Sequence, residues 1–305
     1  MARRSILIDT DPGTDDAVAI LLALGSPELA VEGIVAVAGN VPLAVTERNA
    51  RAICELGGRP DIGVYAGCSA PMTRAPITAE HFHGEEGLGT LALAAPSMAL
   101  RPQHGVDFTV ELLRAAPPGA ITWCALGPLT NVAMALIKAP DIVAGVRELV
   151  LMGGASRALG NVTPAAEYNI HADPHAAEIV FASGMPITMI PLDATHQVRS
   201  TKERIGRIAA IGSPAAAAVA ELLRPTGEQP DALHDPCVIA YLLAPELFKG
   251  SRVNVAIECE SPLTLGMTVV DWRGVSGRAP NATVLHTVDA DGFYELLNGR
   301  LRNNS

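Results

Sequence analysis

Short apolar runs rich in β-branched residues alternate with Ala/Leu-rich stretches through the first two thirds of the chain. The short runs predict buried strands, and the Ala/Leu-rich stretches between them predict helices. The predicted strands are residues 5–8, 31–37, 62–65, 120–124, 148–151 and 186–190, and the predicted helices are residues 17–24, 45–56, 106–115, 131–137 and 174–182. Because apolar strands joined by helices are typical of a parallel sheet covered on both faces, we expect an α/β fold with an open, mostly parallel, Rossmann-like sheet.

The pattern changes in the last third of the chain, where residues 253–258, 267–270 and 283–287 predict strands with no long helix between them. These strands favour a small antiparallel extension of the sheet. No linker or internal repeat divides the sequence, so we expect one domain spanning residues 1–305. Residues 66–105 and 224–235 are rich in Pro, Gly or His and predict irregular active-site loops, since long irregular segments in compact domains are usually functional or disordered.

Composition excludes several classes of partner. The chain has 305 residues, of which 49% are hydrophobic, and its formal net charge of −10 argues against binding to a nucleic acid polymer or an anionic membrane. No apolar run approaches the ~18 residues of a membrane span, and the segment MARRSILID has too short an apolar region for a signal peptide. The five cysteines are odd in number and show no CxxC spacing, which predicts reduced thiols and a cytoplasmic protein.

Four carboxylates lie within eight residues in the segment IDTDPGTDDAVAI, between the first predicted strand and the first predicted helix. Ligands of open parallel sheets bind at the carboxyl ends of strands, where this segment lies. Helix capping explains Asp15 and Asp16, but it leaves Asp9 and Asp11 without a role. Carboxylate and carbonyl oxygens without a soft ligand suit Ca²⁺ or Mg²⁺, so we expect a divalent cation here, with Asp9 orienting its ligands.

Two other interpretations of this segment fail on the residues present. An EF-hand loop would need Gly where Thr14 stands and Glu where Ile20 stands. A phosphatase of the haloacid-dehalogenase type would also begin with a strand and an Asp-x-Asp motif. That class needs a later Gly-Asp motif, however, and this chain has no Gly-Asp dipeptide.

The segment DTDPGTDDAVAI resembles the N-terminal motif of the nucleoside hydrolases of the inosine–uridine-preferring kind, which cleave the N-glycosidic bond of ribonucleosides. The resemblance continues, in the order of the family, through VAGNV, HFHGEEGLG, ALGPLTN, LVLMGGA, GNVTPAAEYNIHADPHAAE, PLDATHQV and HDPC. It implies hydrolysis to ribose and free base by a Ca²⁺-bound water, with one Ca²⁺ per subunit, and a homodimer or homotetramer.

The resemblance also implies a role for each matching residue. The implied Ca²⁺ ligands are Asp11, Asp16, Asp235 and the main-chain carbonyl of Leu126, and Asp11 is also the implied base that activates the water. The implied substrate-binding residues are Asp15, Asn40, His83, Met152, Asn161, Glu167 and Asn169, of which His83 is a base contact or a simple loop residue. His234 is the implied leaving-group acid or base contact.

Base preference follows less directly from the motifs. Purine-preferring members of the family carry Trp where His234 stands, which favours a broad or pyrimidine-tolerant range. Residues 224–233 contain no Tyr, although some relatives close this loop over the base with tyrosines. Two alternatives remain open on the sequence: the same chemistry on another ribosylated compound, such as one like nicotinamide riboside, or a non-catalytic nucleoside- or ribose-binding protein. We expect Asp173, Asp193 and the remaining histidines, including His81 and His196, to be structural or surface residues.

Overall fold

The computed structural model describes residues 3–225, 227 and 230–302. Its strands are β1 (Arg4–Thr10), β2 (Leu29–Ala36), β3 (Val64–Ala66), β4 (Ile121–Ala125), β5 (Val146–Met152), β6 (Ile187–Ile190), β7 (Phe248–Ile257), β8 (Thr268–Asp271) and β9 (Ala282–Val288). Its helices are α1 (Thr14–Leu24), α2 (Leu43–Leu56), α3 (Glu80–His83), α4 (Gly105–Ala115), α5 (Thr130–Lys138), α6 (Tyr168–Ala172), α7 (Pro174–Phe181), α8 (Leu192–Thr195), α9 (Lys202–Ala209), α10 (Pro214–Leu222), α11 (Pro236–Leu243) and α12 (Ala290–Leu301), with 3₁₀ turns η1 (Pro140–Gly145) and η2 (Pro245–Leu247).

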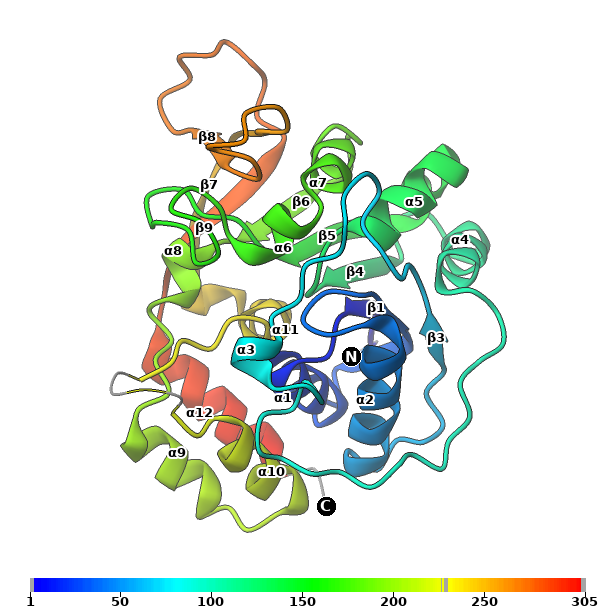
Figure 1. Cartoon of the computed structure of the whole chain (residues 1–305), viewed down its shortest axis with the longest axis vertical. Coiled ribbons are helices and arrows are strands. Elements are labelled where there is room, and N and C mark those ends of the chain that lie inside the picture. Colours follow the sequence, from blue (N-terminus) through cyan, green and yellow to red (C-terminus); the bar gives the residue numbers. More distant parts are fainter. Residues whose placement is uncertain (1–2, 226, 228–229, 303–305) are drawn as a thin grey trace.

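The strands form one twisted sheet in the order β3-β2-β1-β4-β5-β6-β9-β7-β8 (Figure 1). Strands β1 to β6 are parallel, and β9 also runs parallel to β6. The antiparallel part therefore begins at β7, which pairs with β9 on one side and β8 on the other. The predicted α/β class with an antiparallel extension is confirmed.

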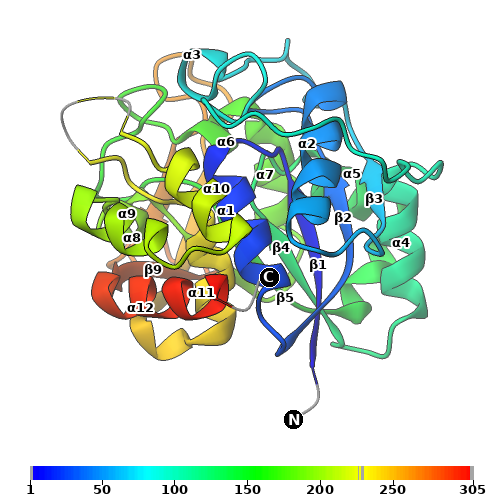
Figure 2. The same cartoon turned by 90° about the horizontal axis from the view of Figure 1, so that it is seen from below.

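Helices cover both faces of this sheet. Helices α4, α5 and α7 pack on one face, and α1, α2, α10, α11 and α12 lie on the other (Figures 1 and 2). Alternate residues of β1 point to opposite faces of the sheet. Leu7 belongs to the apolar cluster of the first face, whereas Ile6 and Ile8 belong to that of the second. Burial on both faces explains why these strands have no polar side in the sequence.

Several elements differ from their predicted limits. Helix α1 begins at Thr14, earlier than predicted, because the side chain of Asp16 accepts a hydrogen bond from the backbone N–H of Gly13 and caps the first turn. Helices α8 to α12 were not predicted. Residues 67–104, within the predicted loop at 66–105, are irregular apart from α3. In the predicted loop at 224–235, residues 226, 228 and 229 lie outside the described residues.

The connections place a crevice at the carboxyl ends of β1 and β4. The chain runs from β1 outward to β2 and β3 on one side, and from β4 outward to β5 and β6 on the other. Ligands of open parallel sheets bind where the strand order reverses in this way. Within the described part of the chain, no helix is long and apolar enough to cross a membrane, and all five cysteines are free thiols, as predicted.

Candidate active site

A cavity of about 860 Å³ opens at the carboxyl ends of the parallel strands. It collects residues from the acidic segment, from both predicted irregular loops and from the ends of β4 and β5. The predicted site residues in its wall are Asp15, Asn40, His83, Leu126, Met152, Asn161, Glu167, Asn169, His234 and Asp235. The other two, Asp11 and Asp16, are completely buried.

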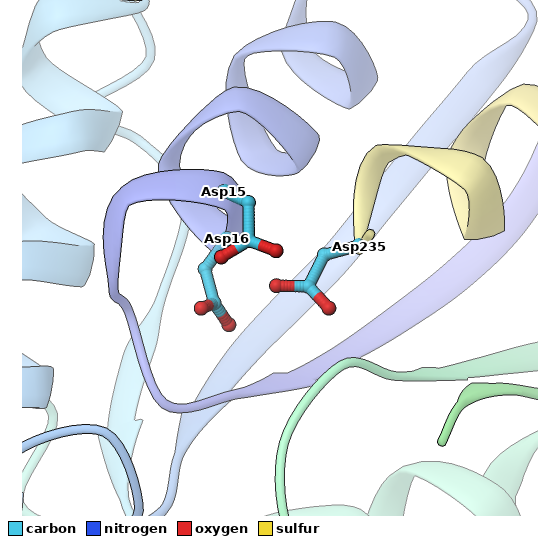
Figure 3. Close-up of side chains that lie close together, drawn as sticks. All are labelled: Asp15, Asp16 and Asp235. Atoms are coloured by element: carbon cyan, nitrogen blue, oxygen red, sulfur yellow. The ribbon is translucent and has the colours of Figure 1, made fainter. Parts of the chain in front are cut away.

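Three carboxylates from opposite ends of the chain point toward one another in this site (Figure 3). One oxygen each of Asp15, Asp16 and Asp235 lies within 4.8 Å of the others. Asp15 and Asp16 belong to the first turn of α1, and Asp235 directly precedes α11. The resemblance implied a set made of Asp11, Asp16 and Asp235, so the structure adds Asp15 to the closest group, while Asp11 does not belong to it.

Asp11 is held in a tight backbone pocket. Its Oδ2 accepts a hydrogen bond of 2.7 Å from the backbone N–H of Asn40, whereas its buried Oδ1 has no hydrogen-bond partner. A Cβ atom on Gly39 would lie 2.0 Å from Oδ2, and one on Gly127 would lie 2.2 Å from Oδ1. Only glycine therefore fits at these two positions. The unpaired Oδ1 still lacks the polar partner that a buried carboxylate oxygen needs.

Asp16 is oriented by four polar contacts. Its Oδ1 accepts from the Thr10 hydroxyl at 2.5 Å and from the backbone N–H of Asp11 at 3.3 Å. Its Oδ2 accepts from the backbone N–H of Gly13 at 3.0 Å and from the Asn40 amide at 3.1 Å. The side chain and backbone of Asn40 thus hold two carboxylates of the site at once.

The acidic residues of the site have no cationic partner among the residues that the structure describes. No ion pair in the described ranges involves Asp11, Asp15, Asp16 or Asp235. Burial, followed by repulsion from neighbouring carboxylates, raises the pKa of Asp11, Asp16 and Asp235. Burial also raises the pKa of Asp9 to about 8, although the amide of Asn131 donates to its Oδ2 and opposes the shift. A bound cation would remove this electrostatic penalty.

Glu167 has a local structural role in addition to its place in the cavity wall. It precedes α6 and caps it, because its carboxylate accepts from the backbone N–H groups of Asn169 at 2.8 Å and Ile170 at 3.2 Å. It also accepts from Gly154 N at 2.8 Å. Burial raises its pKa. The Asn169 amide donates to the carbonyl of Leu126 at 2.6 Å, so the predicted metal-binding carbonyl already has one contact.

Two histidines stand on another part of the cavity wall. His234 Nδ1 lies 2.8 Å from the Thr195 hydroxyl. Burial, together with His196 and Arg199, lowers the pKa of His234 to about 3, so its imidazole is neutral. His83 is buried, and its Nδ1 lies 3.2 Å from the backbone N–H of Thr14 at the start of α1.

Comparison with known proteins assigns the chain to a family. A family model described as inosine-uridine preferring nucleoside hydrolase matches residues 6–295. The chain belongs to the nucleoside hydrolase family. It is therefore a hydrolase of N-glycosyl compounds, and its reaction is the cleavage of ribonucleosides into ribose and free base.

Individual nucleoside hydrolases resemble the chain over nearly its whole length. A pyrimidine-specific ribonucleoside hydrolase, RihA of Salmonella gallinarum, is 45% identical, with 97% of this chain and 98% of the relative covered. A protein of Schizosaccharomyces pombe is 49% identical with the same coverage. The solved structure of a purine-preferring ribonucleoside hydrolase from Gardnerella vaginalis superposes with a TM-score of 0.91 at 32% identity, covering 98% of both chains.

The cavity of this nucleoside hydrolase also contains residues that the sequence analysis did not assign to it. His81 and His196, which we expected to be structural or surface residues, lie in the wall, as do Phe82, Tyr168 and Arg199. All of them except Arg199 belong to motifs that match the family, and this membership was the signal available in the sequence. Asp173 and Asp193, in contrast, support loops and a helix start as expected, through backbone N–H groups at residues 72, 156–158 and 176.

Proposed function

We propose that this nucleoside hydrolase works with one Ca²⁺ per subunit, held by Asp11, Asp16, Asp235 and the carbonyl of Leu126, and that Asp11 is the general base. The observation that carries the proposal is the buried acidic group itself. One oxygen each of Asp15, Asp16 and Asp235 lies within 4.8 Å of the others, and Asp11 Oδ1 is buried without a hydrogen-bond partner. Asp15 stands close enough to contribute to the same electrostatic site.

The donor set fits a hard cation. Every candidate ligand is a carboxylate or carbonyl oxygen, which suits Ca²⁺ and excludes metals that prefer sulfur or imidazole ligands. When bound, Ca²⁺ would supply a positive charge that orders a water molecule and the 2′,3′-diol of the ribose in one frame. The carbonyl of Leu126 accepts one hydrogen bond from Asn169, and a carbonyl oxygen has a second lone pair for a ligand.

Residues of the chain itself would activate the water, stabilise the charge of the sugar and bind its hydroxyls. Asp11 is suited to take a proton from the attacking water, because Asn40 N holds Oδ2 and leaves Oδ1 available. The reaction passes through an oxocarbenium-like sugar, and the nearby carboxylates stabilise its positive charge. We assign the ribose hydroxyls to Asp15 and to four further residues that line the cavity beside Met152, namely Asn40, Asn161, Glu167 and Asn169.

The departing base faces the histidines in our proposal. His234 presents a neutral imidazole whose Nδ1 is engaged by Thr195, so its Nε2 is the atom available to the base. His83 is fixed in the same cavity by Thr14. We propose a range that includes pyrimidine ribonucleosides, supported by His234 where purine-preferring members of the family carry Trp and by the 45% identity to pyrimidine-specific RihA.

A product assay tests this proposal. Purified protein is incubated with inosine, uridine, cytidine or adenosine, and the free base is separated and quantified, with chelator or with added CaCl₂. We expect base release that chelation abolishes and CaCl₂ restores, together with a loss of at least about 10³-fold in kcat for Asp11→Asn. Asp107→Asn is the matched control, because Asp107 is exposed and pairs with Lys138 on the surface.

Chelator-resistant turnover would contradict the Ca²⁺ assignment, and normal turnover by Asp11→Asn would contradict the role of Asp11 as general base.

The homodimer or homotetramer and the cytoplasmic location stay predictions. A native mass measurement and fractionation of cells that produce the protein would test them.

A further inference from the structure

Tyr168 stands between the two residues proposed to bind the sugar, Glu167 and Asn169, and it lines the cavity. Its hydroxyl oxygen lies 2.8 Å from the carbonyl oxygen of Gly39 and 3.1 Å from that of Ile77. A phenol has one proton, so the two carbonyls share a single donor. The hydroxyl thereby joins α6 to two segments that are remote from it in the sequence.

The first of these segments orients two carboxylates of the proposed metal site. Gly39 lies so close to Asp11 that a Cβ atom on it would be 2.0 Å from Oδ2. The next residue, Asn40, donates from its backbone to Asp11 and from its amide to Asp16. A shift of the Gly39 carbonyl would therefore move the donors that orient both carboxylates.

The second segment carries a histidine of the proposed base pocket. Two residues after Ile77, the backbone N–H of Ala79 donates to the carbonyl of Asn40 at 2.9 Å. Helix α3 follows at once and ends with His83, which contacts Thr14 at the start of α1. The Tyr168 hydroxyl thus lies where the Gly39–Asn40 turn, the segment from Ile77 to His83 and helix α6 meet.

We propose that Tyr168 is a positioning residue, whose hydroxyl holds the Gly39–Asn40 turn against α6. This keeps the metal-binding carboxylates of Asp11 and Asp16 at a constant distance from the sugar-binding groups of Glu167 and Asn169. The inference rests on the proposed function. It differs from a packing role for the aromatic ring, because it assigns the effect to one oxygen atom.

The experiment compares Tyr168→Phe, which removes only that oxygen, with the wild-type protein and with Tyr294→Phe. Tyr294 is buried and its hydroxyl lies 2.9 Å from Ser200 Oγ, so the control loses a comparable contact without touching Gly39 or Ile77. Three quantities are measured: the Ca²⁺ dissociation constant by calorimetry, kcat and KM for uridine and inosine at saturating Ca²⁺, and the melting temperature in chelator.

We expect the Ca²⁺ dissociation constant of Tyr168→Phe to rise about fivefold, which corresponds to the loss of one hydrogen bond of about 1 kcal/mol. We also expect kcat to fall by a similar factor with little change in KM, because misalignment of metal site and sugar affects the transition state more than binding. Tyr294→Phe should lower the melting temperature and leave the Ca²⁺ affinity and kcat unchanged.

Wild-type Ca²⁺ affinity and kcat in Tyr168→Phe, with a lowered melting temperature like that of Tyr294→Phe, would overturn the inference and leave the proposed function intact. A wild-type protein that neither binds Ca²⁺ nor releases base in its presence would overturn the proposed function, and the inference with it. The two failures are therefore distinguishable.

Discussion

Asp235→Asn should stabilise the calcium-free protein and destabilise the calcium-bound one. Asparagine keeps the shape of the side chain and removes one charge from the acidic group. In that group, one oxygen each of Asp15, Asp16 and Asp235 lies within 4.8 Å of the others. Two full charges at that distance repel by about 3 kcal/mol at an effective dielectric constant of about 20. Burial and repulsion raise the pKa of Asp235, so protonation already relieves part of this energy. We therefore expect the free energy of unfolding in chelator to rise by roughly 1–2 kcal/mol.

Calcium should reverse the order of stability, so that the wild type becomes more stable than Asp235→Asn. A ligand that binds only the folded state stabilises it by about 2.7 kcal/mol at a concentration of 100 times its dissociation constant. Asp235→Asn loses the charge of one ligand, so calcium at the same concentration should raise its free energy of unfolding by much less. Differential scanning calorimetry in chelator and in a CaCl₂ series measures both effects, because each kcal/mol shifts the melting temperature by about 1.5 °C in a chain of this size. Hydrolysis of inosine and uridine is followed in the same samples.

The control for this experiment is Asp107→Asn, which removes an exposed carboxylate and should leave the calcium response unchanged. A wild-type protein whose melting temperature is insensitive to CaCl₂ would refute the metal site. An Asp235→Asn variant that melts below the wild type in chelator, yet keeps the full calcium shift, would refute the electrostatic reasoning.

Three further predictions follow from the same site. His234→Ala should slow hydrolysis of inosine or uridine far more than that of p-nitrophenyl riboside, because the neutral imidazole can hydrogen-bond the departing base from Nε2, whereas nitrophenolate leaves without such help. Equal losses in kcat/KM on all three substrates would exclude this contact. 2′-Deoxyribonucleosides should be very poor substrates because they lack the diol, and comparable kcat/KM values for deoxyinosine and inosine would contradict binding of the diol by metal. Gly39→Ala should abolish calcium binding, since its methyl group would lie 2.0 Å from Asp11 Oδ2, and an unchanged dissociation constant by calorimetry would show that the Gly39–Asn40 turn relaxes.

Local sequence pattern predicted most of the parallel sheet. Strands buried on both faces, such as β1 and β4, are continuous apolar runs bounded by turns, and that signal does not depend on distant residues. Helix α9 illustrates why later helices were missed. Its apolar stripe consists only of the buried Ile208 and the partly buried Ile205, and two residues in a helix of eight give a weak periodic signal. Its formation depends on the Thr201 cap and on packing against α10 and α12.

The sequence alone determined that an acidic segment follows the first strand, and its adjacent carboxylates predicted a bound cation. It also predicted ten residues that line the cavity. Only the tertiary structure decided that Asp15 belongs to the closest acidic group, that Gly39 and Gly127 enclose Asp11, and that the Tyr168 hydroxyl reaches the carbonyl of Gly39. The physical reason is that periodicity and charge clustering are local properties of the chain. Distances between segments more than a hundred residues apart depend instead on how helices and crossovers pack onto the sheet.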